Sequence, residues 1–127
     1  IDIAKKRNIQ VIERPPHLAG DKVWTQPVIN HTDDELGGLD DEDIIVILQA
    51  NSPQITTEKI DECIDMLINN DLFEVHTIDS TMINNGAIQV IKRKVRNIKG
   101  KVCYNGVVMA DWVDVHTIED INKIGDL

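Results

Sequence analysis

The longest uninterrupted run of hydrophobic residues is Ile44–Leu48, and turn-forming residues bound it on both sides. A strand that is covered on both faces gives such a run, as in the parallel sheets of α/β proteins. Ile9–Glu13 alternates and is rich in β-branched residues, so it predicts a short strand that Pro15 and Pro16 end. Further strands are expected at residues 73–78, 87–91 and 101–109.

Helical patterns alternate with these strands. Residues 2–7 predict the last turns of a helix, with Asn8 at its C-terminal end. A second helix is expected from Asp21 to about Asp34, with Pro27 as an obstacle that splits it or shifts its start.

A third helix is expected to begin at Thr56 or Thr57, since a threonine side chain can cap the first turn. Its apolar residues fall on one face at helical spacing: Ile60, Cys63, Ile64, Leu67 and Ile68. A terminal helix is expected after Thr117, because the acidic residues that follow suit the positive end of a helix. Alternating strands and helices predict a layered α/β fold.

Composition narrows the class of protein. The 127 residues predict one domain, and 13 basic against 22 acidic residues give a net charge of −9. This charge argues against a general nucleic-acid binder, whereas a nucleotide pocket needs only a local group of donors. No apolar run approaches the ~20 residues of a membrane span, and we expect no secretory leader. We therefore expect a cytoplasmic protein with no membrane partner.

Two loops are candidates for a functional site, because ligands of open α/β sheets collect beyond the carboxyl ends of the strands. The first, Gln49–Pro53, follows the apolar run directly. The side chains of Gln49, Asn51 and Ser52 could hydrogen-bond a base edge or a sugar hydroxyl. The alternative is a turn that only carries the chain out of the strand.

The second loop contains Asp114 and His116, which are expected on one face of a strand. A carboxylate and an imidazole together can hold a divalent ion. The alternative is that Asp114 or Thr117 caps the terminal helix while His116 faces solvent. No nucleophile and base are paired in the sequence, and Cys63 is expected in the core. Catalytic residues are therefore not assigned.

Four segments resemble motifs of one enzyme family, the CMP-sialic acid synthetases (acylneuraminate cytidylyltransferases). Arg14–Asp21 (RPPHLAGD) resembles the family's RPxxLAxD, and Ile47–Pro53 (ILQANSP) resembles LLQPTSP. Asn85–Ile88 (NGAI) is similar to NGAIY, and Val113–Asp120 (VDVHTIED) to IDIDTxxD. The four segments occur in the family's order and span nearly the whole chain.

The resemblance implies a three-layer, Rossmann-like nucleotidyltransferase fold, represented here in part. It implies transfer of CMP from CTP to an acidic sugar such as N-acylneuraminate, with Mg²⁺ and release of pyrophosphate. Gln49 and Ser52 would then line the sugar or nucleotide side of a cleft, and Asn85 and Ala87 would lie near the acyl-sugar pocket. Asp114 and His116 fall on the family's paired metal-binding aspartates.

The chain also departs from the family pattern. The phosphate-binding ARxGSKxxPxKN loop has no counterpart in residues 1–127, and six residues stand between Ile78 and Asn85 where the family has a long dimerisation excursion. His116 replaces an aspartate, so Mn²⁺ or Zn²⁺ becomes an alternative to Mg²⁺. We therefore keep two hypotheses, a cytidylyltransferase and a catalytically silent relative that binds a nucleotide or a partner. Because Ile44–Leu48 is too apolar to stay bare, a homo-oligomer is expected in either case.

Overall fold

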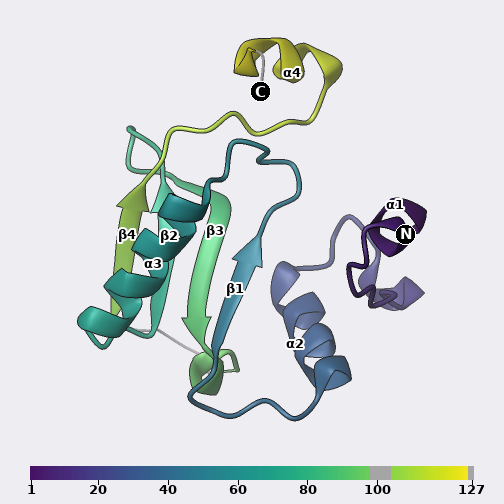
Figure 1. Cartoon of the computed structure of the whole chain (residues 1–127), viewed down its shortest axis with the longest axis vertical. Coiled ribbons are helices and arrows are strands. Elements are labelled where there is room, and N and C mark those ends of the chain that lie inside the picture. The colour runs from purple at the N-terminus through teal and green to yellow at the C-terminus, as the bar shows by residue number, and fades with distance from the viewer. Residues whose placement is uncertain (98–103, 126–127) are drawn as a thin grey trace. The chain divides into compact units, whose positions relative to one another are not determined.

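A computed structural model describes residues 1–97 and 104–125. The chain divides into two compact units, residues 1–40 and 41–127, and each unit is described by itself (Figure 1). No helix of the described ranges is both long and apolar enough to cross a membrane.

The first unit contains helix α1 (Asp2–Lys6), a short 3₁₀ helix η1 (Pro16–Leu18) and helix α2 (Thr25–Leu36). Asn8 follows α1 with a left-handed φ of 55°, as its expected place at the helix end requires. The sequence placed the start of α2 four residues too early. Pro27 explains the later start, because in the first turn its missing N–H needs no partner.

The strand predicted at Ile9–Glu13 is wrong, since these residues form no regular element. A strand exists only where its backbone groups pair with a second strand, and the alternating pattern does not supply a partner. No strand of the described residues pairs with this segment.

The second unit is built on a four-stranded sheet, with β1 (Ile44–Leu48), β2 (Glu74–Ile78), β3 (Asn84–Lys92) and β4 (Asn105–Met109) in the order β1-β3-β2-β4. β3 runs antiparallel to both β1 and β2, and β4 runs parallel to β2. The sheet is therefore mixed: the apolar run of β1 is typical of strands in parallel sheets, whereas β1 pairs antiparallel with β3. The strands at 73–78 and 87–91 are confirmed within a few residues; of the strand at 101–109, residues 101–103 lie outside the described residues.

β1 is an edge strand, and this corrects the expectation that both of its faces are covered. Val46 and Leu48 remain 36% and 48% exposed. Helix α3 (Thr57–Asn69) packs mainly over β2, β3 and β4. It does not extend fully over β1, so part of the side-chain surface of β1 stays exposed. The apolar run predicted the strand correctly, but a run of Ile, Val and Leu does not reveal how far the neighbouring helix reaches.

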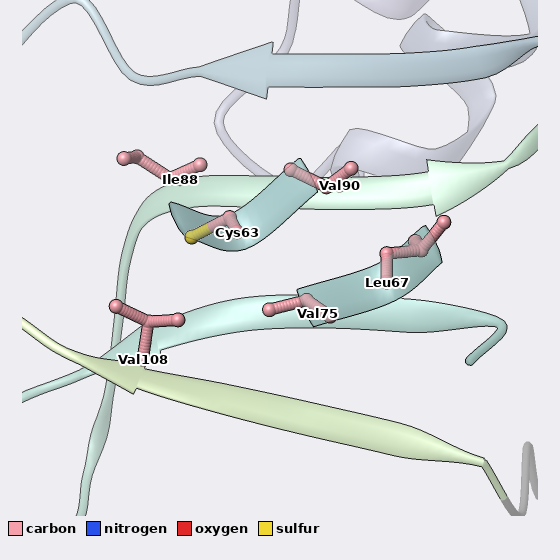
Figure 2. Packing of buried hydrophobic residues seen from close by; sticks show 6 residues of the cluster. All are labelled: Cys63, Leu67, Val75, Ile88, Val90 and Val108. Carbon is pink, nitrogen blue, oxygen red and sulfur yellow. The ribbon is translucent and has the colours of Figure 1, made fainter. Parts of the chain in front are cut away.

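The core lies between α3 and the sheet. Thr56 caps α3 by accepting a hydrogen bond from the Lys59 amide at 3.4 Å. Cys63 and Leu67 of α3 are fully buried against the sheet (Figure 2). Their partners in the cluster are Val75, Ile88, Val90 and Val108.

Most of the predicted apolar face of α3 is confirmed, because Ile60 and Ile64 also pack against this cluster. Ile68 is an error, being 56% exposed. The neighbouring Leu67 is fully buried, and Ile68 lies about 100° further around the helix, beyond the face that the sheet covers.

The described chain ends with helix α4 (Ile118–Ile124), which begins after Thr117 as expected. Asp120 accepts hydrogen bonds from the Thr117 amide and hydroxyl, both at 3.0 Å. This capping arrangement satisfies amide groups that the first helical turn leaves without partners.

Candidate functional site

Three strands point the same way, so their carboxyl ends meet at one edge of the sheet. β1, β2 and β4 end there, and β3 begins there because it is antiparallel to its neighbours. We call this the carboxyl edge and define it by three segments: Gln49–Pro53 after β1, Asp79–Gly86 between β2 and β3, and Ala110–His116 after β4. All seven predicted site residues lie in these segments or, for Ala87, directly beside them.

The loop after β1 is a tight turn held to the sheet. The Gln49 amide donates to the Ala87 carbonyl at 3.0 Å, and the Ser52 amide donates to the Gln49 carbonyl at 3.2 Å. Ser52 is only 4% exposed, whereas Gln49 is exposed. Of these two side chains, Gln49 is the one that solvent or a ligand can reach.

Gln49 also lies directly over Gly86. A Cβ at Gly86 would come within 2.8 Å of the Gln49 Nε2 atom, and Gly86 has a left-handed φ of 67°. The glycine therefore allows both the turn at the start of β3 and the close approach of the glutamine amide.

Asn85 connects the ends of three strands. Its Nδ2 donates to the Ala110 carbonyl at 2.6 Å, and its Oδ1 accepts from the Thr77 hydroxyl at 2.6 Å and the Ala87 amide at 3.2 Å. The amide group is thus engaged within the protein, and Ala87 is 1% exposed. The structure places both residues at the carboxyl edge, where they hold the loops in position.

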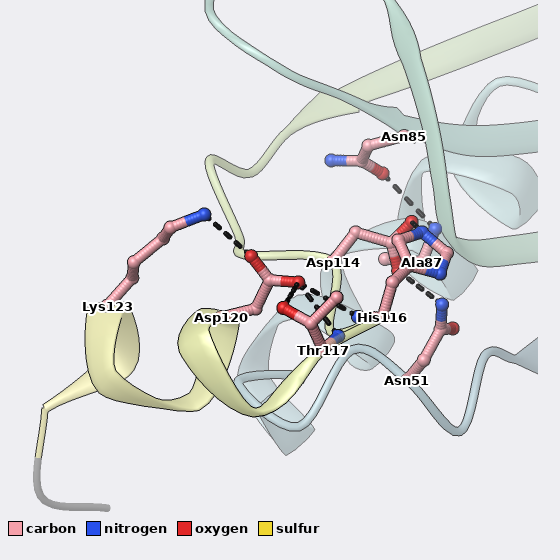
Figure 3. A network of polar contacts seen from close by, with 8 residues as sticks. All are labelled: Asn51, Asn85, Ala87, Asp114, His116, Thr117, Asp120 and Lys123. Carbon is pink, nitrogen blue, oxygen red and sulfur yellow. Dashed lines mark hydrogen bonds and ion pairs between the residues drawn. The ribbon is translucent and has the colours of Figure 1, made fainter.

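Asp114 lies between two polar partners (Figure 3). The Asn51 Nδ2 donates to Asp114 Oδ1, and the His116 Nε2 lies 2.8 Å from Asp114 Oδ2. The Val115 amide also donates to the Asn51 carbonyl at 2.8 Å. Two loops that are more than 60 residues apart in sequence are joined in this way.

The strand expected at Asp114–His116 is wrong, because β4 ends at Met109 and the following residues lie outside any ladder. The two side chains nevertheless meet, since residues two apart in an extended segment point to one side. Their exposed fractions are 44% for Asp114 and 69% for His116. Thr117 caps α4, as one of the two alternatives expected, while the exposed His116 contacts Asp114.

As a metal centre, this pair is a weak match for Mg²⁺. Both Asp114 oxygens already accept from or contact a neighbour. Within residues 1–97 and 104–125, no three His, Cys, Asp or Glu side chains are grouped so that they could hold an ion. Mg²⁺ prefers several oxygen ligands, whereas one carboxylate and one imidazole suit Mn²⁺ or Zn²⁺ better.

Sequence reasoning missed three residues in or directly beside this edge. Gln54 accepts from the Val113 amide at 2.8 Å, and Asp111 accepts from the Ser80 amide at 2.7 Å. The Asp79 carboxylate accepts from the Thr81 hydroxyl and amide and from the Ile83 amide, and these hydrogen bonds hold its pKa below the usual range. The Asp-Ser-Thr sequence is a turn signal and could have indicated Asp79.

Cys63 is confirmed as a core residue. Burial is the main cause that raises the pKa of its thiol to about 11. A thiol that stays protonated at neutral pH is a poor nucleophile, so it contributes packing.

A separate hollow of about 350 Å³ lies at the opposite end of the sheet. It is lined by Asn70, Asp71, Phe73 and Tyr104, which precede β2 and β4 or follow α3. None of the predicted site residues contributes to it.

The fourth segment that resembles a family motif, residues 14–21, belongs to the first unit and includes η1.

Comparison with models of known protein families gave no match, and comparison with curated proteins gave none either.

Proposed function

We propose that the chain is a domain of the CMP-sialic acid synthetase type, with a partial three-layer nucleotidyltransferase fold, and that its carboxyl edge binds a cytidine nucleotide or an acidic sugar. One observation carries this proposal. Three segments that resemble separate motifs of that family, around residues 49–53, 85–88 and 113–117, are joined by direct hydrogen bonds. Asn51 contacts Asp114, and the Gln49 amide donates to the Ala87 carbonyl.

The residues divide into a supporting and a ligand-facing set. Asn85, Ser52 and Ala87 are buried or engaged within the protein, so they fix the loops. Gln49 and His116 are exposed and carry groups that hydrogen-bond a base, a carboxylate or a sugar hydroxyl. In the reaction that the family resemblance implies, a sugar hydroxyl attacks the α-phosphate of CTP and pyrophosphate leaves. This edge would orient the attacking sugar.

Binding is tested by titrating ¹⁵N-labelled protein with CMP, CTP, N-acetylneuraminate and Kdo. We expect the amide signals of Gln49, Gly86 and Val115 to shift, and Gln49→Ala to weaken binding about tenfold, as loss of one or two hydrogen bonds does. Gln10→Ala is the matched control, since Gln10 is an exposed glutamine of the first unit. If none of the four compounds moves these signals at millimolar concentration, the proposal fails.

A second candidate is a relative that binds without catalysing transfer. The contacts of both Asp114 oxygens with Asn51 and His116 favour it, because these neighbours compete with a cation for the carboxylate. Pyrophosphate release from CTP with sialic acid or Kdo separates the two candidates, with Mg²⁺ or Mn²⁺ present. We expect no appreciable turnover from the 127-residue chain. A rate near ~1 s⁻¹, ordinary for enzymes, would contradict the binding-only candidate.

A further inference from the structure

The carboxyl edge carries charge of one sign. Its three segments contain Asp79, Asp111 and Asp114 but no lysine or arginine. His116 contacts Asp114 at 2.8 Å and offsets the charge of that carboxylate only when the imidazole is protonated. A surface of one sign disfavours ligand groups of the same sign, and phosphate and carboxylate are such groups here.

Three backbone amides in the loop between β2 and β3 are occupied by oxygen atoms of the protein itself. The Ser80 amide donates to Asp111 at 2.7 Å. The Thr81 and Ile83 amides donate to Asp79 at 2.8 and 3.1 Å. Loops that bind phosphate instead leave such amides directed at the ligand. A ligand anion at this loop would therefore have to displace a carboxylate that is already in place.

Helix α4, which follows the edge, does not change this balance. Its basic residue, Lys123, pairs with Asp120 at 2.6 Å. Asp120 also accepts a hydrogen bond from the Thr117 amide at 3.0 Å, at the start of the helix. The positive charge of the lysine and the amide at the helix start are thus both engaged by a carboxylate of the same helix.

Hydrogen-bond acceptors are what the edge offers to a ligand. The carboxylates of Asp79, Asp111 and Asp114 lie there together with the exposed side chain of Gln49. An ionised carboxylate has about four lone-pair sites, so an oxygen that already accepts from an amide can also accept from a hydroxyl group. The chemistry that fits this edge is an uncharged group with several hydroxyl donors.

We propose that the carboxyl edge receives an uncharged, hydroxyl-bearing part of its ligand, either the ribose of a nucleoside or the polyol chain of a sugar, and that phosphate and carboxylate groups bind away from it. This selectivity rests on the proposed function, because it names which part of that ligand the edge contacts. The donors for the ligand's anionic groups must then come from outside the three segments of the edge.

Two pairs of compounds test this selectivity, because the members of each pair differ in one charged group. Cytidine is compared with CMP, and the methyl ester of N-acetylneuraminate with N-acetylneuraminate itself, by titration of ¹⁵N-labelled protein without divalent metal ions. The pair that binds shows whether the source is a nucleoside or a sugar. In that pair we expect the uncharged member to bind about threefold more tightly, or better, at low salt. Added salt should narrow the difference, because it screens the repulsion.

Asp111→Asn isolates the charge of the edge. Asparagine keeps an oxygen that can accept from the Ser80 amide, while one negative charge is removed. The ratio of the two dissociation constants, charged over uncharged, should therefore fall about twofold. Asp61→Asn is the matched control, since it removes an exposed aspartate of α3 and should leave this ratio as it is in the native chain.

The possible outcomes separate this selectivity from the proposed function. A charged compound that binds as tightly as its uncharged partner at low salt overturns the selectivity, and the proposed function stands because the edge still binds a ligand. An equal ratio in native and Asp111→Asn protein overturns it as well. The salt series needs no variant, so it remains decisive if Asp111→Asn does not fold. If none of the four compounds shifts the amide signals of Gln49 and Gly86, the proposed function fails and the selectivity fails with it.

Discussion

Gly86 has a left-handed backbone, and the neighbouring Gln49 amide occupies the space where a side chain would begin. Both properties are expected to make Gly86→Ala lower the free energy of unfolding. The left-handed φ alone costs about 1–2 kcal/mol, and the contact with Gln49 must also be relieved. Gly38→Ala is the matched control, since Gly38 has a nearly equal φ of 66° and no atom within 4 Å of the place that a Cβ would occupy. Because the exposed Gln49 side chain is flexible and can move aside at small cost, urea unfolding should show similar losses for the two variants, and a loss several kcal/mol larger at Gly86 would show that Gln49 is held in place.

Asp114 and His116 are the residues for which an ion is proposed. We expect Mn²⁺ or Zn²⁺ to bind more tightly than Mg²⁺, because imidazole suits these ions. Calorimetric titration should lose this binding in His116→Ala and keep it in His17→Ala, which removes an exposed histidine of the first unit. Equal binding by native and His116→Ala protein would show that His116 is no ligand.

The contacts of individual residues show how much of this site the sequence could predict. The pairing of Asp114 with His116 follows from their spacing, because residues two apart in an extended segment share a side. The contact between Asn51 and Asp114 does not, since it depends on β1 and β4 ending at the same edge. The burial of Ser52 was likewise not predictable from a loop composition that is typical of exposed turns.

Among the elements, α4 depends on a single carboxylate at its start. The Lys123 ammonium and the amides of His116 and Thr117 hold the pKa of Asp120 well below its usual range. In the unfolded chain the pKa of an aspartate is about 4, and in the folded chain the pKa of Asp120 is lower. The ionised carboxylate therefore stabilises the folded form at pH values above about 4, and this contribution is lost as the pH falls from there through the folded-state pKa. Asp120→Ala should therefore fray residues 118–124, observed as faster amide exchange. Glu119→Ala, which removes an acidic residue from the same turn, should have a smaller effect.

Elements were predicted well where the signal is local and poorly where it depends on a partner. The caps at Thr56 and Thr117 lie within one turn of the helices they begin, and both helices are confirmed. Ile9–Glu13 has a strand composition but no pairing, and Ile44–Leu48 is a strand with more exposure than its composition indicates. Periodicity reports which residues could be buried, and topology decides which of them are.

At the scale of the whole molecule, the core cluster lies entirely within the second unit. Its buried members run from Cys63 to Val108, and the partly buried residues around it run from Ile44 to Trp112. Residues 41–127 expressed alone are therefore expected to fold cooperatively and to keep the amide protection of β2 and β3. Thermal unfolding followed by circular dichroism would check this. A fragment without a cooperative transition would show that residues 1–40 are needed for the fold.

The strand order also dictates a sequence of events during folding. β2 and β3 are neighbours in the chain and can form a hairpin quickly. In the described sheet β1 pairs with β3, and the residues between these two strands include all of α3 and β2. Contacts that close long loops form slowly. On the ribosome, the apolar residues 44–48 must therefore wait until about residue 92 has emerged before they have a partner. Pulse-labelled hydrogen exchange during refolding should find β2 and β3 protected before β1, and until then β1 is the segment most exposed to wrong pairing and to chaperones.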